Sequence, residues 1–111
     1  MFTPRVQNEQ TDFLMKALLA LQDMEEAYRF CEDVLTFQEL ISITQRLEVA
    51  VMLRQKITYQ EIAKKTGAST TTISRVNRCL VYGAEGYNLL LDRLAADGHA
   101  RTKQKQRNER I

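Results

Sequence analysis

The sequence predicts an all-α protein of six helices, and three observations carry this prediction. The chain of 111 residues contains one Pro and four Gly, so few residues interrupt a helix. Apolar residues recur three and four positions apart, which is the period of a helix with one buried face. Two Thr-x-x-Glu sequences, Thr36–Glu39 and Thr58–Glu61, are capping boxes of the kind that begin helices. Residues 1–98 are of a size expected for one helical domain.

Three helices are expected in the first half of the chain. Thr3 and Pro4 supply a cap and a first-turn proline for a helix over residues 5–21. Asp23 begins a second helix, which carries two glutamates in its first turn, where the helix dipole favours negative charge. Thr36 begins a third, longer helix that reaches about Gln55.

The second half is expected to contain three shorter helices. Thr58 opens a helix that Gly67 ends, because glycine readily takes the left-handed conformation that closes a helix. Either Ser69 or Thr70 caps the next helix, which extends to about Tyr82. A last apolar helix covers residues 87–96 and stops at Gly98.

Charge is segregated along the chain, although the net charge is only +2. Residues 1–53 hold four basic and nine acidic side chains, whereas residues 54–80 hold six basic side chains and one acidic side chain. Residues 99–111 add five basic groups without apolar periodicity and are expected to form a disordered basic tail. A basic stretch within a structured segment suggests a polyanionic partner, and a solubilising surface is the alternative.

Several classes of function are not favoured by the composition. Apolar runs are far shorter than the ~20 residues of a membrane span, and no signal-peptide pattern begins the chain, so we expect a cytoplasmic protein. Cys31 and Cys79 are then expected to be reduced thiols. The only histidine is His99, and no clustered His/Cys pattern predicts a metal site. No convergent set of catalytic groups or phosphate-binding glycine loop is recognisable, so we predict no enzymatic activity.

Residues 58–82 have the pattern of a helix-turn-helix, a motif that enters the major groove of DNA. Ala63 provides the small residue that allows the two helices to cross closely, and Gly67 provides the turn. Ile73 and Val76 lie three residues apart and form the apolar stripe of the second helix. Ile62 and Leu80 are expected to complete this small core.

The opposite face of the second helix is expected to contact double-stranded DNA. Hydroxyl groups can bond to base edges, so we predict that Thr70, Thr71 and Ser74 read the sequence. The residues expected to hold the phosphate backbone are Gln60, Lys64, Lys65, Ser69, Arg75 and Arg78. The alternatives are a helical hairpin with an ordinary polar surface, or a helix-turn-helix that docks on the transcription machinery with little specific DNA binding.

Residues 35–80 resemble the Trp repressor superfamily, and within it the YerC/YecD branch. The resemblance is carried by Leu35-Thr36, Arg46, the Tyr-Gln-Glu-Ile sequence from Tyr59, Thr66-Gly67-Ala68, and the Thr-Ile-Ser-Arg sequence that ends at Arg75. It implies a six-helix protomer, an intertwined homodimer and transcription regulation, most simply repression. The leucine-rich and aromatic-rich first helices independently suggest a dimer, because one small subunit does not cover so much apolar surface.

The resemblance also implies a pocket for a small effector. In Trp repressors an indole lies between two arginines, and Arg46 and Arg75 match those positions. Thr36 and Thr72 match threonines of the same pocket. This chain departs from the family at the two remaining positions, where Val76 replaces a glycine and Cys79 replaces a serine.

A β-branched side chain at position 76 would project into the space that an indole ring needs, which argues against tryptophan. We expect no cofactor, and another small effector is the alternative. Arg46 and Arg75 then have an alternative interpretation, which we favour. They would contact phosphate, or pair within the chain with Glu48 or Glu39.

Overall fold

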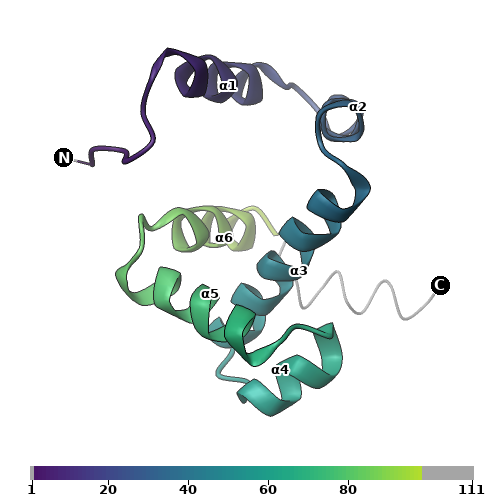
Figure 1. Ribbon diagram of the computed structural model, residues 1–111, viewed down its shortest axis with the longest axis vertical. Coiled ribbons are helices and arrows are strands. Elements are labelled where there is room, and N and C mark those ends of the chain that lie inside the picture. The colour runs from purple at the N-terminus through teal and green to yellow at the C-terminus, as the bar shows by residue number, and fades with distance from the viewer. Residues whose placement is uncertain (1, 99–111) are drawn as a thin grey trace. The chain divides into compact units, whose positions relative to one another are not determined.

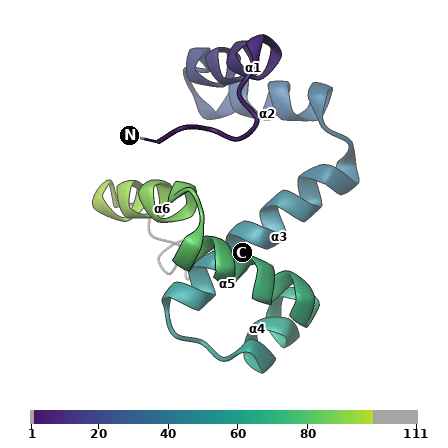
Figure 2. The same cartoon turned by 60° about the vertical axis from the view of Figure 1, so that its left-hand side comes forward.

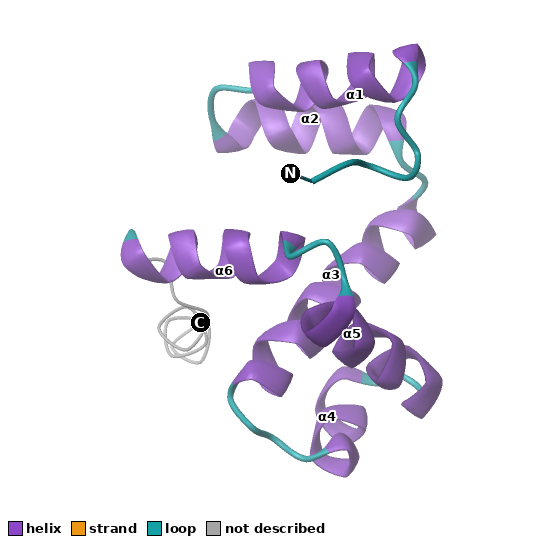
Figure 3. Cartoon of the chain, turned by 90° about the vertical axis from the view of Figure 1, so that its left-hand side faces the viewer, coloured by secondary structure: helices purple, strands orange, loops and turns teal. Residues whose placement is uncertain are grey.

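The computed structural model describes residues 2–98, and its elements are all helices in that range (Figures 1 and 3). The helices in chain order are α1 (Glu9–Ala20), α2 (Met24–Val34), α3 (Phe37–Arg54), α4 (Tyr59–Thr66), α5 (Thr70–Tyr82) and α6 (Gly86–Ala96). The predicted all-α class is therefore confirmed. The expected basic tail and His99 lie outside the described residues. No helix between residues 2 and 98 is long and apolar enough to cross a membrane.

The first helix begins later than predicted, and Thr3-Pro4 is not its cap. Its N-cap is Asn8, whose side-chain oxygen accepts a hydrogen bond from the Thr11 amide at 2.8 Å. The Thr11 hydroxyl accepts a bond from the Asn8 amide at 2.8 Å and donates one to the carbonyl of Val6 at 2.8 Å. This reciprocal capping box satisfies the first amides of α1, so the helix has no need to extend towards Pro4.

The predicted caps of the next two helices are confirmed. Asp23 is the N-cap of α2 and accepts a hydrogen bond from the Glu26 amide at 2.9 Å. Before α3, the Glu39 carboxylate accepts from the Thr36 amide at 2.8 Å, and the Thr36 hydroxyl accepts from the Glu39 amide at 3.0 Å. Both hydrogen bonds of this capping box are therefore formed, as the Thr-x-x-Glu spacing predicts.

Contacts divide the chain after Ser42 into an N-terminal unit and a C-terminal unit. In the N-terminal unit, α1 and α2 contain no buried residue. Large apolar side chains such as Phe13 and Leu19 are 75% and 85% exposed. In water such surface is unfavourable at about 25 cal/mol per Å². The single chain therefore leaves the apolar face of these two helices uncovered.

The C-terminal unit holds the hydrophobic core, which α3, α4 and α5 build together. Its buried members are Val49, Ala50, Ile62, Ala68, Ile73 and Val76. Half-buried apolar residues of α6, among them Tyr87 and Leu91, pack against this cluster. Of the four core residues predicted from the helix-turn-helix pattern, Ile62, Ile73 and Val76 are buried, and Leu80 is half-buried against them.

The sixth helix is held to the rest of the C-terminal unit by polar contacts. The Arg54 guanidinium pairs with the Asp92 carboxylate and donates to the carbonyl of Asn88 at 3.3 Å. The Asn88 side-chain amide in turn donates to the carbonyl of Leu80 at 3.1 Å. The N-cap, Glu85, takes a left-handed φ of 70° without a side-chain capping bond. Contacts along α6, rather than its cap, therefore fix where this helix lies.

Candidate nucleic-acid interface

Helices α4 and α5 form the helix-turn-helix that the sequence predicts, and Figure 2 shows them adjacent at one end of the C-terminal unit. Thr58 caps α4 by accepting from the Glu61 amide at 3.2 Å. Gly67 ends α4 with φ 77° and donates its amide to the carbonyl of Ala63 at 2.9 Å. Ser69 rather than Thr70 is the N-cap of α5. Only three residues separate the two helices, so the turn between them is tight.

The buried faces of α4 and α5 hold the motif together. Ile62 and Ile73 are fully buried and Val76 is 1% exposed. Half-buried Ala63 and Leu80 pack against the same cluster. Because the apolar residues point inward, the polar residues of α5 that alternate with them are left on the outer surface.

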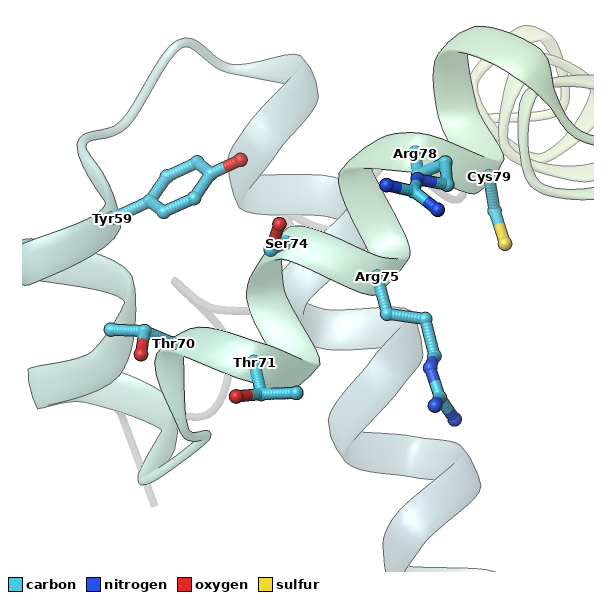
Figure 4. A pocket seen from close by; sticks show the side chains of 7 residues that line it. All are labelled: Tyr59, Thr70, Thr71, Ser74, Arg75, Arg78 and Cys79. Atoms are coloured by element: carbon cyan, nitrogen blue, oxygen red, sulfur yellow. The ribbon is translucent and has the colours of Figure 1, made fainter.

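A hollow of about 570 Å³ lies on that outer surface between the start of α4 and the length of α5 (Figure 4). Its lining combines hydroxyl groups, two guanidinium groups, one aromatic ring and one thiol. The lining residues are Tyr59, Thr70, Thr71, Ser74, Arg75, Arg78 and Cys79.

The hollow brings together five of the nine residues predicted to bind DNA. All three predicted base-reading residues, Thr70, Thr71 and Ser74, line it, together with Arg75 and Arg78. The exposed side chains of Gln60, Lys64 and Lys65 belong to α4 and do not line it. Ser69 serves as the cap of α5, since its hydroxyl oxygen accepts from the Thr72 amide at 3.1 Å.

Four cations of the motif form no ion pair with other residues of the range 2–98. They are Lys64, Lys65, Arg75 and Arg78. These exposed cations can attract a polyanion without first breaking an internal ion pair.

The residues predicted for an effector pocket differ from one another in burial and in whether they line the hollow. The Val76 side chain belongs to the core, whereas Cys79 is exposed and lines the hollow. Thr72 and Arg46 are half-buried. Thr36 lies in the N-terminal unit and caps α3.

Two of these residues, Arg46 and Cys79, influence the pKa of Tyr87 on α6. Burial raises the pKa of the Tyr87 phenol, the Arg46 charge lowers that pKa, and the Cys79 thiol raises it again. Burial is the largest of the three effects. The phenol of Tyr87 is therefore held neutral beside a cation of α3 and a thiol of α5.

Sequence reasoning missed one residue that lines the hollow, Tyr59, whereas Cys79, predicted for the effector pocket, lines the hollow instead. Tyr59 is the first residue of α4, and its position directly after the N-cap could have indicated that it lies near the start of α5. Whether Tyr59 lines the hollow depends on the crossing angle of α4 and α5, and residue spacing within one helix does not determine that angle. Groups of three or more His, Cys, Asp or Glu residues able to hold a metal ion are absent from the described part of the chain.

Comparison with known proteins gives the same picture over most of the chain. A family model described as Trp repressor protein matches residues 9–95. This chain belongs to the Trp repressor family. The resemblance inferred from residues 35–80 is therefore confirmed, and it extends to the first and last helices.

Relatives from three organisms agree with this assignment to the Trp repressor family. YerC, an uncharacterised protein of Bacillus subtilis, is 50% identical over 90 residues, which cover 81% of this chain and 86% of YerC. The crystal structure of a TrpR-like protein from Eubacterium eligens is 52% identical with a TM-score of 0.79, covering 82% of this chain and 94% of that one. A Staphylococcus aureus structure, also named for the Trp repressor, is 43% identical with a TM-score of 0.78, covering 82% and 91%.

Proposed function

We propose that this protein is a sequence-specific, DNA-binding transcriptional regulator that acts as a repressor in the cytoplasm. The observation that carries the proposal is the hollow, where hydroxyl and guanidinium groups of α5 face outward from a helix-turn-helix. Membership of the Trp repressor family supports the same class of function. A bound repressor would act by occupying DNA that the transcription machinery needs.

The residues divide into two roles in this proposal. Thr71 and Ser74 on α5, together with Thr70, would exchange hydrogen bonds with base edges in the major groove. Cationic side chains, the Gln60 amide and the Ser69 hydroxyl around them would contact phosphates and set the register of the helix on the duplex. The residues with this second role are Gln60, Lys64, Lys65, Ser69, Arg75 and Arg78.

Recognition of a two-fold site requires two copies of the motif. The uncovered apolar face of α1 and α2 supports a homodimer, because a second chain would remove that surface from water. Exposed Phe37, at the start of α3, continues the same apolar character. Two recognition helices in a dimer would enter successive major grooves about 34 Å apart.

Selection of bound sites from a pool of random duplexes tests the proposal directly. The expected result is a two-fold motif with half-sites one helical turn apart. Recovery of no motif, together with binding that does not fall as salt rises, would refute DNA recognition. That outcome would instead favour a helix-turn-helix that docks on another protein, since protein docking does not release phosphate counterions.

We propose further that DNA binding needs no tryptophan. Val76 supports this, because the resemblance matches it to a glycine of the Trp repressor pocket, and a buried β-branched side chain occupies that position here. The recovered duplex should then bind with equal affinity with and without added tryptophan. A clear gain in affinity would assign the effector pocket to Arg46, Arg75 and their neighbours after all.

A further inference from the structure

Tyr59 is the one lining residue of the hollow that comes from α4 rather than α5. Its ring extends from the start of α4 towards α5, and its hydroxyl lies on the same side as the hydroxyl of Ser74 in Figure 4. Tyr59 is the first residue of α4, directly after the N-cap Thr58. A rigid aromatic side chain therefore forms one wall of the surface proposed to bind DNA.

The Tyr59 hydroxyl makes no hydrogen bond to any residue of the described chain. The residue is 38% exposed, so its ring is partly packed while its polar end is accessible. A phenolic hydroxyl is a donor as well as an acceptor, and an aromatic side chain loses little entropy when it is fixed. This side chain is thus ready to donate to an acceptor that enters the hollow.

We propose that Tyr59 donates a hydrogen bond to a phosphate oxygen of the DNA and so fixes the register of α5 in the groove. The inference rests on the proposed function. The first helix of a helix-turn-helix crosses the DNA backbone, whereas the second helix reaches the bases. Tyr59 belongs to the first helix, and the guanidinium groups of Arg75 and Arg78 line the same hollow. A phosphate beside Tyr59 would accept from the phenol and be attracted by the Arg78 guanidinium of the same hollow.

An uncharged phosphate donor has an effect that separates it from lysine or arginine. Loss of a cation weakens binding and flattens its salt dependence, because fewer counterions are released. Loss of the Tyr59 hydroxyl removes a donor but no charge. Tyr59→Phe should therefore weaken binding while the slope of log affinity against log salt concentration stays the same.

The test measures the affinity of wild type and Tyr59→Phe for the selected duplex and for an unrelated duplex of equal length, over a range of salt concentrations. We expect at least about tenfold weaker binding for each lost contact, from the usual strength of a hydrogen bond to a charged acceptor, and so about a hundredfold for a dimer on either duplex, with equal salt slopes. Thermal melting should be unchanged, because the Tyr59 hydroxyl makes no hydrogen bond to residues 2–98 that the variant could lose. Tyr82→Phe is the matched control, since Tyr82 ends α5, is 85% exposed and does not line the hollow.

The contact can also be removed from the DNA side. Replacing phosphates one at a time by neutral methylphosphonates should reveal one position per half-site at which wild type and Tyr59→Phe bind equally. The phosphate substitution changes only the DNA, so it leaves the fold of both proteins unaltered.

Four results would overturn the inference. They are Tyr59→Phe binding within threefold of wild type, a loss confined to the selected duplex, a flattened salt slope, or an equal loss in Tyr82→Phe. Each of these leaves the proposed function intact, because wild type still binds DNA. Only a wild-type protein that binds no duplex would remove the proposed function and this inference together.

Discussion

Replacing Lys64 by alanine should change the salt dependence of DNA binding by a calculable amount. Lys64 lies in the last turn of α4, is exposed, and makes no ion pair in the part of the chain that the structure describes. Each phosphate contact contributes about −0.9 to the slope of log affinity against log salt concentration. A dimer would lose two such contacts, so the slope should become shallower by about 1.8.

The change in slope means that the affinity of wild type depends much more steeply on salt than the affinity of Lys64→Ala. Between about 50 and 200 mM salt, wild type should lose about twelvefold more affinity than Lys64→Ala, from a fourfold salt change and the slope difference of about 1.8. The effect should be the same on selected and unrelated duplexes, because phosphate contacts carry no sequence information. Titration of a fluorescent duplex at several salt concentrations measures both slopes.

Lys16→Ala supplies the matched control, because Lys16 is an exposed lysine on α1 outside the helix-turn-helix. Its slope should equal that of wild type. A Lys64→Ala slope that also equals wild type would show that α4 does not lie on the backbone, and the role given to this helix would be wrong. A change of only about 0.9 would mean that one copy of the motif touches the DNA.

Three further changes test other parts of the description. Thr71→Ala should alter the preference at one base pair in a repeated site selection, at a cost of about 1–3 kcal/mol there, and an unchanged motif would argue against base reading by this residue. Gly67→Ala should lower the free energy of unfolding, measured by urea denaturation, by about 1–2 kcal/mol, because alanine is strained at a φ of 77°. No atom lies within 4 Å of the added Cβ, so the loss would come from the backbone conformation alone. Gly67→Asn should lower the free energy of unfolding by less, because asparagine takes this conformation more readily. Burial raises the pKa of Tyr87, so its neutral form stabilises the fold below the unfolded pKa of about 10, and this contribution should disappear as the pH rises through the folded pKa. Tyr87→Phe should not show that loss, and identical alkaline melting curves for the two proteins would contradict the raised pKa.

Much of the helix-turn-helix was predictable because its signals are local. A glycine four residues after Ala63 and a Thr-x-x-Glu box report the ends of α4 through backbone conformation alone. The spacing of Ile73 and Val76 gives the buried face of α5, and the hydroxyl residues then fall on the other face. Each of these inferences needs only neighbours within one or two helical turns.

The features that were not predicted depend on less regular or more distant contacts. The start of α1 was misplaced because its capping box uses Thr11 where the common pattern has Glu or Gln. The left-handed conformation of Glu85 has no sequence signal, since non-glycine residues rarely take it. Tyr59 joins the hollow only through the crossing of α4 and α5, and the division after Ser42 reflects contacts across the whole chain.

The absence of any buried residue in α1 and α2 has a consequence for the cell rather than for the site. If a second chain supplies their missing cover, the stability of these helices becomes a function of protein concentration. The melting temperature should then rise when the protein is concentrated. In a cell that holds few copies, a newly made chain would stay without a partner and would present a single helix-turn-helix. The abundance of the regulator would then set a threshold concentration, below which the genes that it controls stay unregulated.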